Sequence, residues 1–591
     1  MKSIRHLLPF LKEHKWKYAL GILILIVIDG LQLITPRIIG YLTDDLLMGR
    51  ATFNVLYMYM FIILAIACFV AIGRFSWRML IIGSSRKLEA WLRERLFVHL
   101  ETLPTSFFNT HKTGDLMALA TNDINSVRMA FGIGIVMVTD AIFLTVMTLI
   151  IMITNLDLKL TLLAVLPMPI IAIAVTLLGF RIRKRFKHVQ EAFGKLTDKT
   201  QETFAGIRIV KSFVQEESEL ESFRLFNEDN YKANMSLVRV WSVMFPFVSL
   251  ISAVSLIVAL SYGGQLVING TLTLGEFVSF ITYLGKLTWP MLAIGWLVNM
   301  MQRGFVSLGR ISEILDEDPA YEEDKIHLNP ELDERLSIPV PHHGITFKNV
   351  TYTYPGANFP ALDQVSFEIE SGKTLAIVGR TGAGKTTITN LLLRLFDGFD
   401  GEINIGGQSI HDYPVAQVRQ LIGFVPQDNF LFSKSVHHNI LFSGVEASRE
   451  KVIDFAKLAQ LHKEVEGFSD GYETMLGERG VNLSGGQKQR LSIARALIKN
   501  PPILVFDDAL SAVDTKTEDL LLEGLKEQTS EKTTIIIAHR ISTVRHADHI
   551  IVIDEGKLVE SGTHDMLLKD DGIYADMYKK QMLEERILEE A

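Results

Sequence analysis

The chain has 591 residues, of which 48% are hydrophobic, and it carries a formal net charge of −8. Its mean hydropathy of +0.24 is high for a soluble protein. The long apolar runs lie almost entirely in the first half, so we expect a membrane half joined to a soluble half. The negative net charge gives no reason to expect nucleic-acid binding. The single cysteine, Cys68, excludes an intramolecular disulfide, and we expect it to be a buried, inert thiol.

Six apolar segments in the first half are each long enough to cross a bilayer as a helix. The first exceeds the apolar core of a secretory signal peptide and further spans follow it, so we interpret it as a membrane helix. We predict spans at residues 18–41, 55–82, 131–154, 159–180, 243–269 and 274–301. Together they predict an all-α membrane domain over residues 1–315.

Basic residues predict the orientation of these spans. They gather before the first span, after the second and after the fourth, whereas residues 262–273 contain neither Lys nor Arg. We therefore expect both termini and the two long loops, 83–130 and 181–242, in the cytoplasm of a multi-pass plasma-membrane protein. Both loops show helical spacing of apolar residues, as at Leu92 and Leu96, so we expect the membrane helices to continue beyond the bilayer.

Two acidic residues lie at membrane depth, Asp29 in the first span and Asp140 in the third. An ionised group at this depth is costly and usually faces a water-filled path or a partner. We interpret both as candidates for the wall of a substrate cavity that attracts cations. The alternatives are a polar contact between helices and a bilayer boundary that lies elsewhere.

The second half begins with an acidic, proline-bearing segment that we interpret as a linker, residues 316–343. An apolar strand at 375–378 then runs directly into residues 379–386, which match G-x-x-x-x-G-K-[ST]. In this motif the backbone N–H groups of a glycine-rich loop wrap phosphates at a helix N-terminus. Lys385 is predicted to reach the β- and γ-phosphates, and Thr386 to bind Mg²⁺. The predicted nucleotide-binding residues here are Gly379, Arg380, Thr381, Gly382, Ala383, Gly384, Lys385, Thr386 and Thr387.

A second apolar strand, at 503–507, ends in two acids, Asp507 and Asp508. Beside a phosphate-binding loop, such an acid is typical of a protein that hydrolyses ATP, and Asp507 is predicted to hold Mg²⁺ through water. A buried strand that ends in a structural Asp is common. The pair is therefore informative mainly together with the loop at 379–386.

Leu483-Ser-Gly-Gly-Gln487 precedes a predicted helix at 488–499 and presents a glycine-loosened helix N-terminus to a phosphate. With this pentapeptide the chain resembles the ATP-binding cassette (ABC) transporter family, whose signature it is. The resemblance covers essentially the whole chain, which looks like a half-exporter of the bacterial multidrug and lipid type. It implies a type I exporter-like, six-helix membrane domain followed by an α/β P-loop nucleotide-binding domain at 344–580, with a tail at 581–591.

The resemblance also implies roles for residues that are uninformative singly. Tyr354 looks like the aromatic residue that stacks on adenine. Gln427 is similar to the glutamine that links Mg²⁺ and the attacking water to the membrane domain, and His539 resembles the switch histidine that contacts the γ-phosphate. Asp514 lies in a segment that resembles the loop crossing to the opposite nucleotide domain. The residues expected to contact ATP held by a partner are Leu483, Ser484, Gly485, Gly486 and Gln487.

The family usually carries Glu, the catalytic base, at the position of Asp508. A general base must come within hydrogen-bond reach of the water that it activates, and its positioning contributes about 10²–10⁴ in rate. The shorter Asp withdraws the carboxylate by roughly one C–C bond, about 1.5 Å. We therefore expect slow hydrolysis at this chain's own site. Its intact signature is expected to complete a competent site on a different half-transporter that carries Glu. The alternative is a homodimer in which Asp508 works less well than Glu.

The leading interpretation is ATP-driven export of amphipathic or multidrug-type compounds, with ATP and Mg²⁺ as cofactors and Asp508, Gln427 and His539 as catalytic residues. Thr386, Asp507 and Gln427 are the predicted metal site. A lipid flippase of the same fold is a second interpretation, because the sequence hardly separates the two. A third is an ATP-gated channel or regulatory subunit, which the weak base favours and the intact signature opposes.

Overall fold

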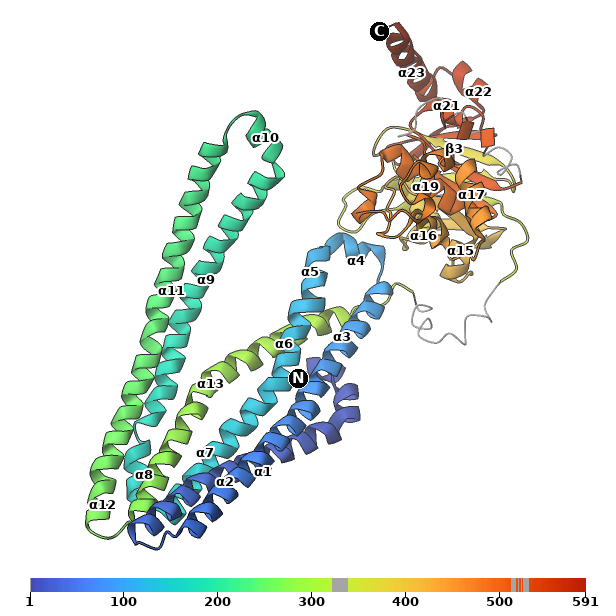
Figure 1. Cartoon of the computed structure of the whole chain (residues 1–591). Coiled ribbons are helices and arrows are strands. Elements are labelled where there is room, and N and C mark those ends of the chain that lie inside the picture. Colours follow the sequence, from blue (N-terminus) through green and yellow to red (C-terminus); the bar gives the residue numbers. More distant parts are fainter. Residues whose placement is uncertain are drawn as a thin grey trace. The chain divides into compact units, whose positions relative to one another are not determined.

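The structure, a computed structural model, describes residues 2–321, 338–511 and 531–590, together with 517–518, 520–521 and 523–524. It divides into two compact units, shown with the rest of the chain in Figure 1. The helical unit comprises Met1–Glu101 and Thr113–Glu317, and the α/β unit comprises Thr102–Lys112 and Asp318–Ala591. Asp514 and part of the predicted linker lie outside the described residues.

The helical unit consists of long helices that run on past the apolar segments (Figure 1). α1 spans Leu8–Leu47 and α13 spans Leu274–Leu315. Three others continue through π-helical turns, so that Phe53–Glu101, Thr113–Asn155 and Glu216–Ile268 are each unbroken. Further elements are η1 (Lys2–His6), α2 (Phe53–Trp77), η2 (Arg78–Ile82), α3 (Gly83–Glu101), α5 (Thr113–Ala118), η3 (Leu119–Asp123), α6 (Ile124–Met129), η4 (Ala130–Gly134), α7 (Ile135–Asn155), α8 (Leu158–Val165), α9 (Met168–Ala205), α10 (Ile207–Ser212), α11 (Glu216–Val258), η5 (Ala259–Gly263) and α12 (Gly264–Ile268).

The fourth predicted span, at 159–180, differs from the other five. Among the described residues, five helices are long and apolar enough to cross a membrane. The fourth span instead falls on α8 and the first part of α9, and the helix is interrupted between them at Leu166 and Pro167. Proline lacks a backbone N–H and clashes with the preceding helical turn, but it is tolerated where a helix begins. Pro167 and Pro169 at the start of α9 therefore account for the break.

Helices α1 and α13 approach each other closely at two glycines. A Cβ on Gly275 would lie 2.0 Å from the Gly40 carbonyl oxygen, and a Cβ on Gly40 would lie 2.1 Å from Ser279 Oγ. Small residues allow this backbone approach in membrane proteins. The Asp44 carboxylate joins the same helices, because it accepts hydrogen bonds from the Gly275 N–H and the Thr273 hydroxyl at 2.7 Å each.

Cys68, on α2, is exposed, so the expectation of a buried thiol is wrong. None of the most apolar stretch of the helix Phe53–Glu101 is buried inside the protein. A membrane helix that faces lipid is apolar without being covered by protein. An apolar run in a membrane span is therefore a poor indicator of burial.

The α/β unit is built on two sheets. A four-stranded antiparallel sheet has the order β2-β1-β4-β5, and a six-stranded sheet has the order β10-β9-β3-β8-β7-β6. In the second sheet β10 is antiparallel to β9, and the other strands are parallel. The strands are β1 (Ile345–Tyr352), β2 (Leu362–Ile369), β3 (Thr374–Val378), β4 (Asp400–Ile405), β5 (Gln408–Ser409), β6 (Ile422–Val425), β7 (Ile503–Asp507), β8 (Thr533–Ile537), β9 (His549–Asp554) and β10 (Lys557–Gly562).

The carboxyl ends of the parallel strands meet at one edge of the six-stranded sheet. Ile537, the last residue of β8, pairs with both Ile377 of β3 and Asp507 of β7, and β6 lies beside β7. Ligands of open parallel sheets bind at this edge. The segments that end or follow these four strands contain the loop at 379–386, Asp507 with Asp508, His539 and Gln427.

Among the described residues, three apolar cores support the α/β unit, and two of them include residues of the predicted nucleotide-binding motifs. One joins both sheets with α14 (Lys385–Leu392) and includes Ala383 of the phosphate loop. The other packs β6 and β7 against α16, α17 and α19 and includes Leu483 of the signature. The predicted boundary at residue 580 falls inside the last helix, α23. The helices are α4 (Thr105–Thr110), α15 (Val415–Leu421), α16 (Val436–Ile440), η8 (Leu441–Ser443), α17 (Arg449–Leu458), α18 (His462–Glu466), η9 (Gly471–Glu473), η10 (Glu478–Gly480), α19 (Gly485–Ile498), α21 (Ile541–Val544), α22 (His564–Lys569) and α23 (Ile573–Glu590).

Candidate active site

The loop at 379–386 follows β3 and turns sharply into α14. Gly379 has a φ of 152° and Gly384 a φ of 101°, both in the left-handed region. A Cβ on Gly379 would lie 2.0 Å from the Ile553 carbonyl oxygen, and one on Gly384 would lie 2.3 Å from that of Ala361. These positions accept only glycine, and the backbone can then fold around phosphate groups at the N-terminus of α14.

Lys385 is the first residue of α14 and is 6% exposed. Its Nζ donates hydrogen bonds to the carbonyl oxygens of Gly379 at 2.8 Å and Arg380 at 2.9 Å, so the side chain lies folded over the loop. Burial lowers the pKa of Lys385, and the charges of Asp507 and Asp508 oppose that shift. A desolvated ammonium group gains strongly from an anionic ligand, which phosphate supplies.

Asp507 ends β7 and is 1% exposed. Burial raises the pKa of Asp507, while a hydrogen bond with the Thr386 side chain lowers it and the charge of Asp508 raises it further. Its Oδ2 is buried without a hydrogen-bond partner. Hard cations such as Mg²⁺ prefer oxygen ligands. An unpaired carboxylate oxygen beside a hydroxyl therefore fits a Mg²⁺ site, although metal binding here stays a prediction.

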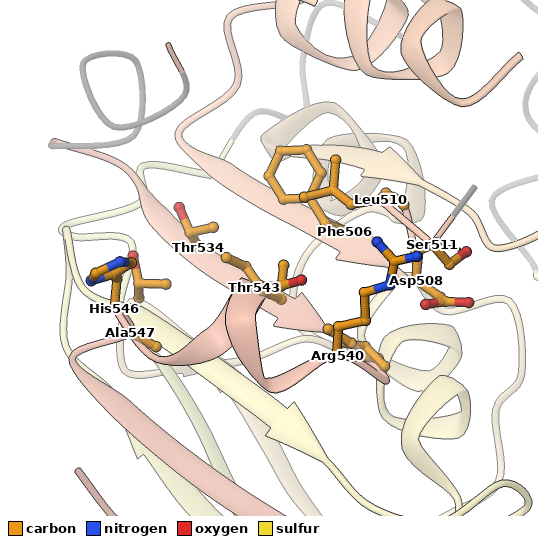
Figure 2. Close-up of a pocket in the computed structure, with 14 residues that line it drawn as sticks. Phe506, Asp508, Leu510, Ser511, Thr534, Arg540, Thr543, His546 and Ala547 are labelled. Atoms are coloured by element: carbon orange, nitrogen blue, oxygen red, sulfur yellow. Dashed lines mark hydrogen bonds between the residues drawn. The ribbon is translucent and has the colours of Figure 1, made fainter. Parts of the chain in front are cut away.

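Asp508 follows with a φ of 50°. Its N–H donates to the Ile537 carbonyl at 2.8 Å and so extends the pairing of β7 with β8. The Gln489 amide, on α19, donates to the Asp508 carbonyl at 3.3 Å and to Ser511 Oγ at 3.2 Å. The backbone of Asp508 is thus held through both its N–H and its carbonyl group. Half-buried Asp508 lines a cavity of about 90 Å³ together with Ser511 and Arg540 (Figure 2).

His539 lies two residues after the end of β8, close enough to Asp507 to interact with it electrostatically. A glutamine that the sequence analysis placed in a tail holds this segment. The Gln581 side chain, on α23, donates to the His539 carbonyl at 2.5 Å and accepts from the Ile541 N–H at 2.7 Å. The two bonds bracket His539 and fix the start of α21. No motif marks Gln581, so only the fold reveals it.

Tyr354 follows β1 and is half-buried. Its hydroxyl lies 3.0 Å from Thr387 Oγ1 on α14. Its ring meets Tyr352 and Phe396 edge to face, at centroid distances of 5.1 and 5.2 Å. The ring is therefore held beside the helix that begins at the phosphate loop. Phe396, which the sequence analysis did not single out, is part of its support.

The signature caps the N-terminus of α19. The Ser484 hydroxyl accepts from the Gln487 N–H at 3.3 Å, and Gln487 Oε1 accepts from the Ser484 N–H at 2.8 Å. This reciprocal capping box fixes an exposed helix N-terminus above buried Leu483. Gln427, after β6, is exposed. The phosphate loop and the signature thus rest on different cores of the α/β unit.

Two family models match the chain. One is described as the ABC transporter transmembrane region and matches residues 18–291, and the other is described as ABC transporter and matches residues 362–511. The probable multidrug resistance ABC transporter ATP-binding/permease protein YheI of Bacillus subtilis (strain 168) is 39% identical over 97% of each chain. The chain belongs to the ABC transporter family.

This ABC transporter also resembles a lipid exporter and a solved exporter structure. The ATP-dependent lipid A-core flippase of Syntrophus aciditrophicus (strain SB) is 31% identical, over 100% of this chain and 96% of the relative. The structure of a bacterial Atm1-family ABC exporter with ATP bound has a TM-score of 0.77 and is 28% identical, over 96% of this chain and 99% of that chain.

These similarities confirm the predicted fold class, a helical type I ABC exporter domain followed by an α/β P-loop domain. The ABC transporter is a multi-pass membrane protein that binds ATP and couples ATP hydrolysis to export. Exporters of this type dimerise. The roles of individual residues stay predictions.

The two membrane acids of this ABC transporter lie together. Asp29 is 4% exposed on α1, and its carboxyl group interacts directly with that of Asp140 on α7. Gln32 donates to Asp29 at 3.5 Å and accepts from Arg74 at 3.1 Å, and the charge of Lys286 also acts on Asp29. The structure thus places both acids in a polar contact between helices with two cations nearby. Their role in attracting cations stays a prediction.

A cavity of about 920 Å³ lies elsewhere in the helical unit of this ABC transporter, among α9, α11 and α13. Ligand pockets commonly have volumes of about 300–1,000 Å³. Neither Asp29 nor Asp140 is among its described lining residues. No sequence motif marks this cavity, because its lining residues come from distant segments of the chain. Its aromatic and basic lining residues are Phe180, Arg183, Phe186, Trp241, Trp296 and Arg303.

Proposed function

We propose that this ABC transporter is one half of a heterodimeric exporter that moves amphipathic compounds across the plasma membrane. The observation that carries the proposal is Asp508, at the position where the family usually carries Glu, in a chain whose signature at 483–487 is intact. The name of the multidrug resistance relative supports the amphipathic class of substrate. The distribution of basic residues supports cytoplasmic termini.

In the proposed cycle, two ATP molecules are each held between the phosphate loop of one subunit and the signature of the other. The loop at 379–386 surrounds the phosphates and Lys385 balances their charge, while Tyr354 supports the adenine. Thr386 and Asp507, with Gln427, would hold Mg²⁺, and the ion would neutralise charge on the transferring phosphoryl group.

Hydrolysis at the chain's own site depends on Asp508 and His539. Asp508 is the base that takes a proton from the attacking water, and His539 contacts the γ-phosphate. Because the Asp carboxylate is held short of the position that Glu would reach, this step loses part of the roughly 10²–10⁴ in rate that a positioned base supplies. The partner's site, with Glu and the signature of this chain, carries most of the turnover.

The test is the ATPase rate of the purified complex with Asp508 replaced. We expect Asp508→Ala and Asp508→Glu each to leave the turnover of the complex nearly unchanged, because the partner's site dominates. Co-purification of the tagged full-length chain, with mass analysis, is expected to return a second half-transporter. Loss of nearly all turnover in Asp508→Ala, in a complex that contains only this chain, would show a homodimer instead.

A lipid flippase is the second candidate, and the similarity to the lipid A-core flippase favours it. The two functions are separated in vesicles that contain the complex. If the complex exports amphipathic compounds, the vesicles take up a fluorescent amphiphile when ATP is supplied, whatever their lipid composition. A flippase instead moves a labelled phospholipid between leaflets. Movement of neither substrate, despite ATP binding, would favour a nucleotide-gated channel or a regulatory subunit.

A further inference from the structure

The cavity among α9, α11 and α13 carries charge of one sign. Its described lining residues include Arg183 on α9 and Arg303 on α13, and they include no Asp or Glu. The Arg183 guanidinium donates to Asn299 Oδ1 at 3.0 Å and lies 4.5 Å from the centroid of the Phe180 ring. These contacts, one across to α13 and one along α9, hold the Arg183 charge at the cavity wall without neutralising it.

Several arginines of the helical unit form ion pairs with acids, among them Arg86, Arg93 and Arg128. Further along α13, Arg310 forms an ion pair with Asp123 at 2.9 Å. By contrast, no ion pair is formed by Arg183 or Arg303 with an acid in the part of the chain that the structure describes. Both side chains are exposed, and they share a cleft with apolar, aromatic walls. Such walls focus the field of charges of one sign, so the two cations together attract an anion.

The rest of the cavity suits an apolar, aromatic body. Trp241 on α11 and Trp296 on α13 are 50% and 56% exposed, and both line it. Phe180 and Phe186 add apolar surface from α9. Aromatic side chains offer a large apolar contact area and a stacking surface. The combination of aromatic walls with two cations is therefore suited to an amphiphile rather than to a free ion.

We propose that this cavity binds amphiphiles that join an apolar or aromatic body to a negatively charged head group, with Arg183 and Arg303 as the ligands of that group. The inference rests on the proposed export function, because it names the substrate class of the same exporter. Arg185, two residues along α9, does not line the cavity. Arg185 therefore serves as a control from the same basic segment that carries the Arg183 charge.

The experiment measures ligand binding to the full-length chain, with whatever partner co-purifies, in phosphatidylcholine nanodiscs without ATP. The probes are tetraphenylborate and tetraphenylphosphonium, which have nearly the same shape and opposite charge. Binding is followed by tryptophan fluorescence. We expect Arg303→Gln to weaken tetraphenylborate binding about tenfold, or about 1.4 kcal/mol, and not to weaken tetraphenylphosphonium binding. Comparing variants cancels the unequal partitioning of the two ions into lipid.

Three matched variants complete the design. Arg303→Lys should keep most of the preference for the anion, Arg183→Gln should lose it, and Arg185→Gln should behave as the unmodified protein. An equal effect of Arg303→Gln on both probes, or the same loss in Arg185→Gln, would overturn the inference. If Arg303→Gln does not fold, Arg183→Gln serves with the same criteria.

A second arm identifies where the anionic head group comes from. Nanodiscs that also contain phosphatidylglycerol should weaken tetraphenylborate binding to the unmodified protein more than to Arg303→Gln if an anionic lipid occupies the cavity. An equal effect on both proteins points to a soluble anionic amphiphile. The binding assay contains no ATP and does not depend on transport, so failure of ATP-driven transport would contradict only the proposed function. ATP-driven export by a protein that shows no arginine-dependent preference for the anionic probe would contradict only this inference.

Discussion

At the scale of single residues, Asp507 carries an electrostatic cost that its ligand is expected to relieve. Burial raises the pKa of Asp507, and its Oδ2 has no hydrogen-bond partner. An acid with a raised pKa binds protons more readily in the folded state than in the unfolded state. The free energy of unfolding therefore falls as pH rises from the acid's ordinary pKa through the raised one.

Asp507→Asn should separate this stability cost from function. Removing a buried carboxylate whose Oδ2 has no hydrogen-bond partner is expected to raise the Tm of the nucleotide-free protein at neutral pH, since such an unsatisfied group costs about 1–3 kcal/mol. ATP hydrolysis at this site should be lost. The Tm of both proteins, measured from acidic to neutral pH without nucleotide, should differ least at acidic pH, where Asp507 is protonated. A variant that is less stable at every pH would contradict this account.

Gln581 is expected to act on hydrolysis through His539. It donates to the His539 carbonyl at 2.5 Å and accepts from the Ile541 N–H at 2.7 Å, so Gln581→Ala frees the backbone on both sides of the histidine. We expect kcat to fall several-fold to tenfold in a complex whose partner site is inactivated, with KM for ATP nearly unchanged, because two hydrogen bonds worth about 1 kcal/mol each are lost.

Lys580→Ala is the matched control for Gln581→Ala, because Lys580 is the exposed neighbour on the same helix. Its kinetics should equal those of the unmodified protein. An assay in which the partner's site is inactivated isolates the turnover of this chain. An increase in KM without a change in kcat would assign Gln581 to nucleotide binding instead.

At the scale of secondary-structure elements, the contact between α1 and α13 depends on glycine. A Cβ on Gly275 would lie 2.0 Å from the Gly40 carbonyl oxygen, so Gly275→Ala must separate the two helices. Such overpacking typically costs 1–3 kcal/mol. We expect a lower Tm in detergent for this variant. Gly285→Ala on the same helix meets nothing within 4 Å and should leave Tm unchanged or slightly raised. Equal effects of the two substitutions would exclude a specific contact.

The elements also show how far the sequence could be used for prediction. The phosphate loop, the acid pair and the signature could be predicted because phosphate chemistry restricts both residue type and spacing, and the family similarity supports the predicted fold. Gln581 and Arg303 were missed because each acts through tertiary contacts between distant segments. The break before α9 was missed although Pro167 and Pro169 mark it. Hydropathy alone treats a proline within an apolar run as part of a continuous span.

At the scale of the whole transporter, the phosphate loop and the signature of this chain belong to different ATP sites in the proposed heterodimer. Lys385 lies in the phosphate loop of the chain's own site, whereas Ser484 caps the helix that completes the partner's site. The loop and the signature rest on separate cores, so a change at one need not disturb the other locally. Their substitutions should therefore have unequal consequences.

We expect Ser484→Ala to lower the ATPase rate of the complex at least tenfold, because it removes a hydroxyl and a helix cap at the competent site. Lys385→Ala should lower the rate far less, because it disables the site that already turns over slowly. Both are measured on the complex purified through this chain, with ATP binding counted per complex. A homodimer has two identical sites, each using both residues, so both substitutions would then abolish turnover alike. Equal losses of ATPase rate in Ser484→Ala and Lys385→Ala would therefore contradict the proposal of two unequal ATP sites. This holds even if Asp508→Ala also proved inactive.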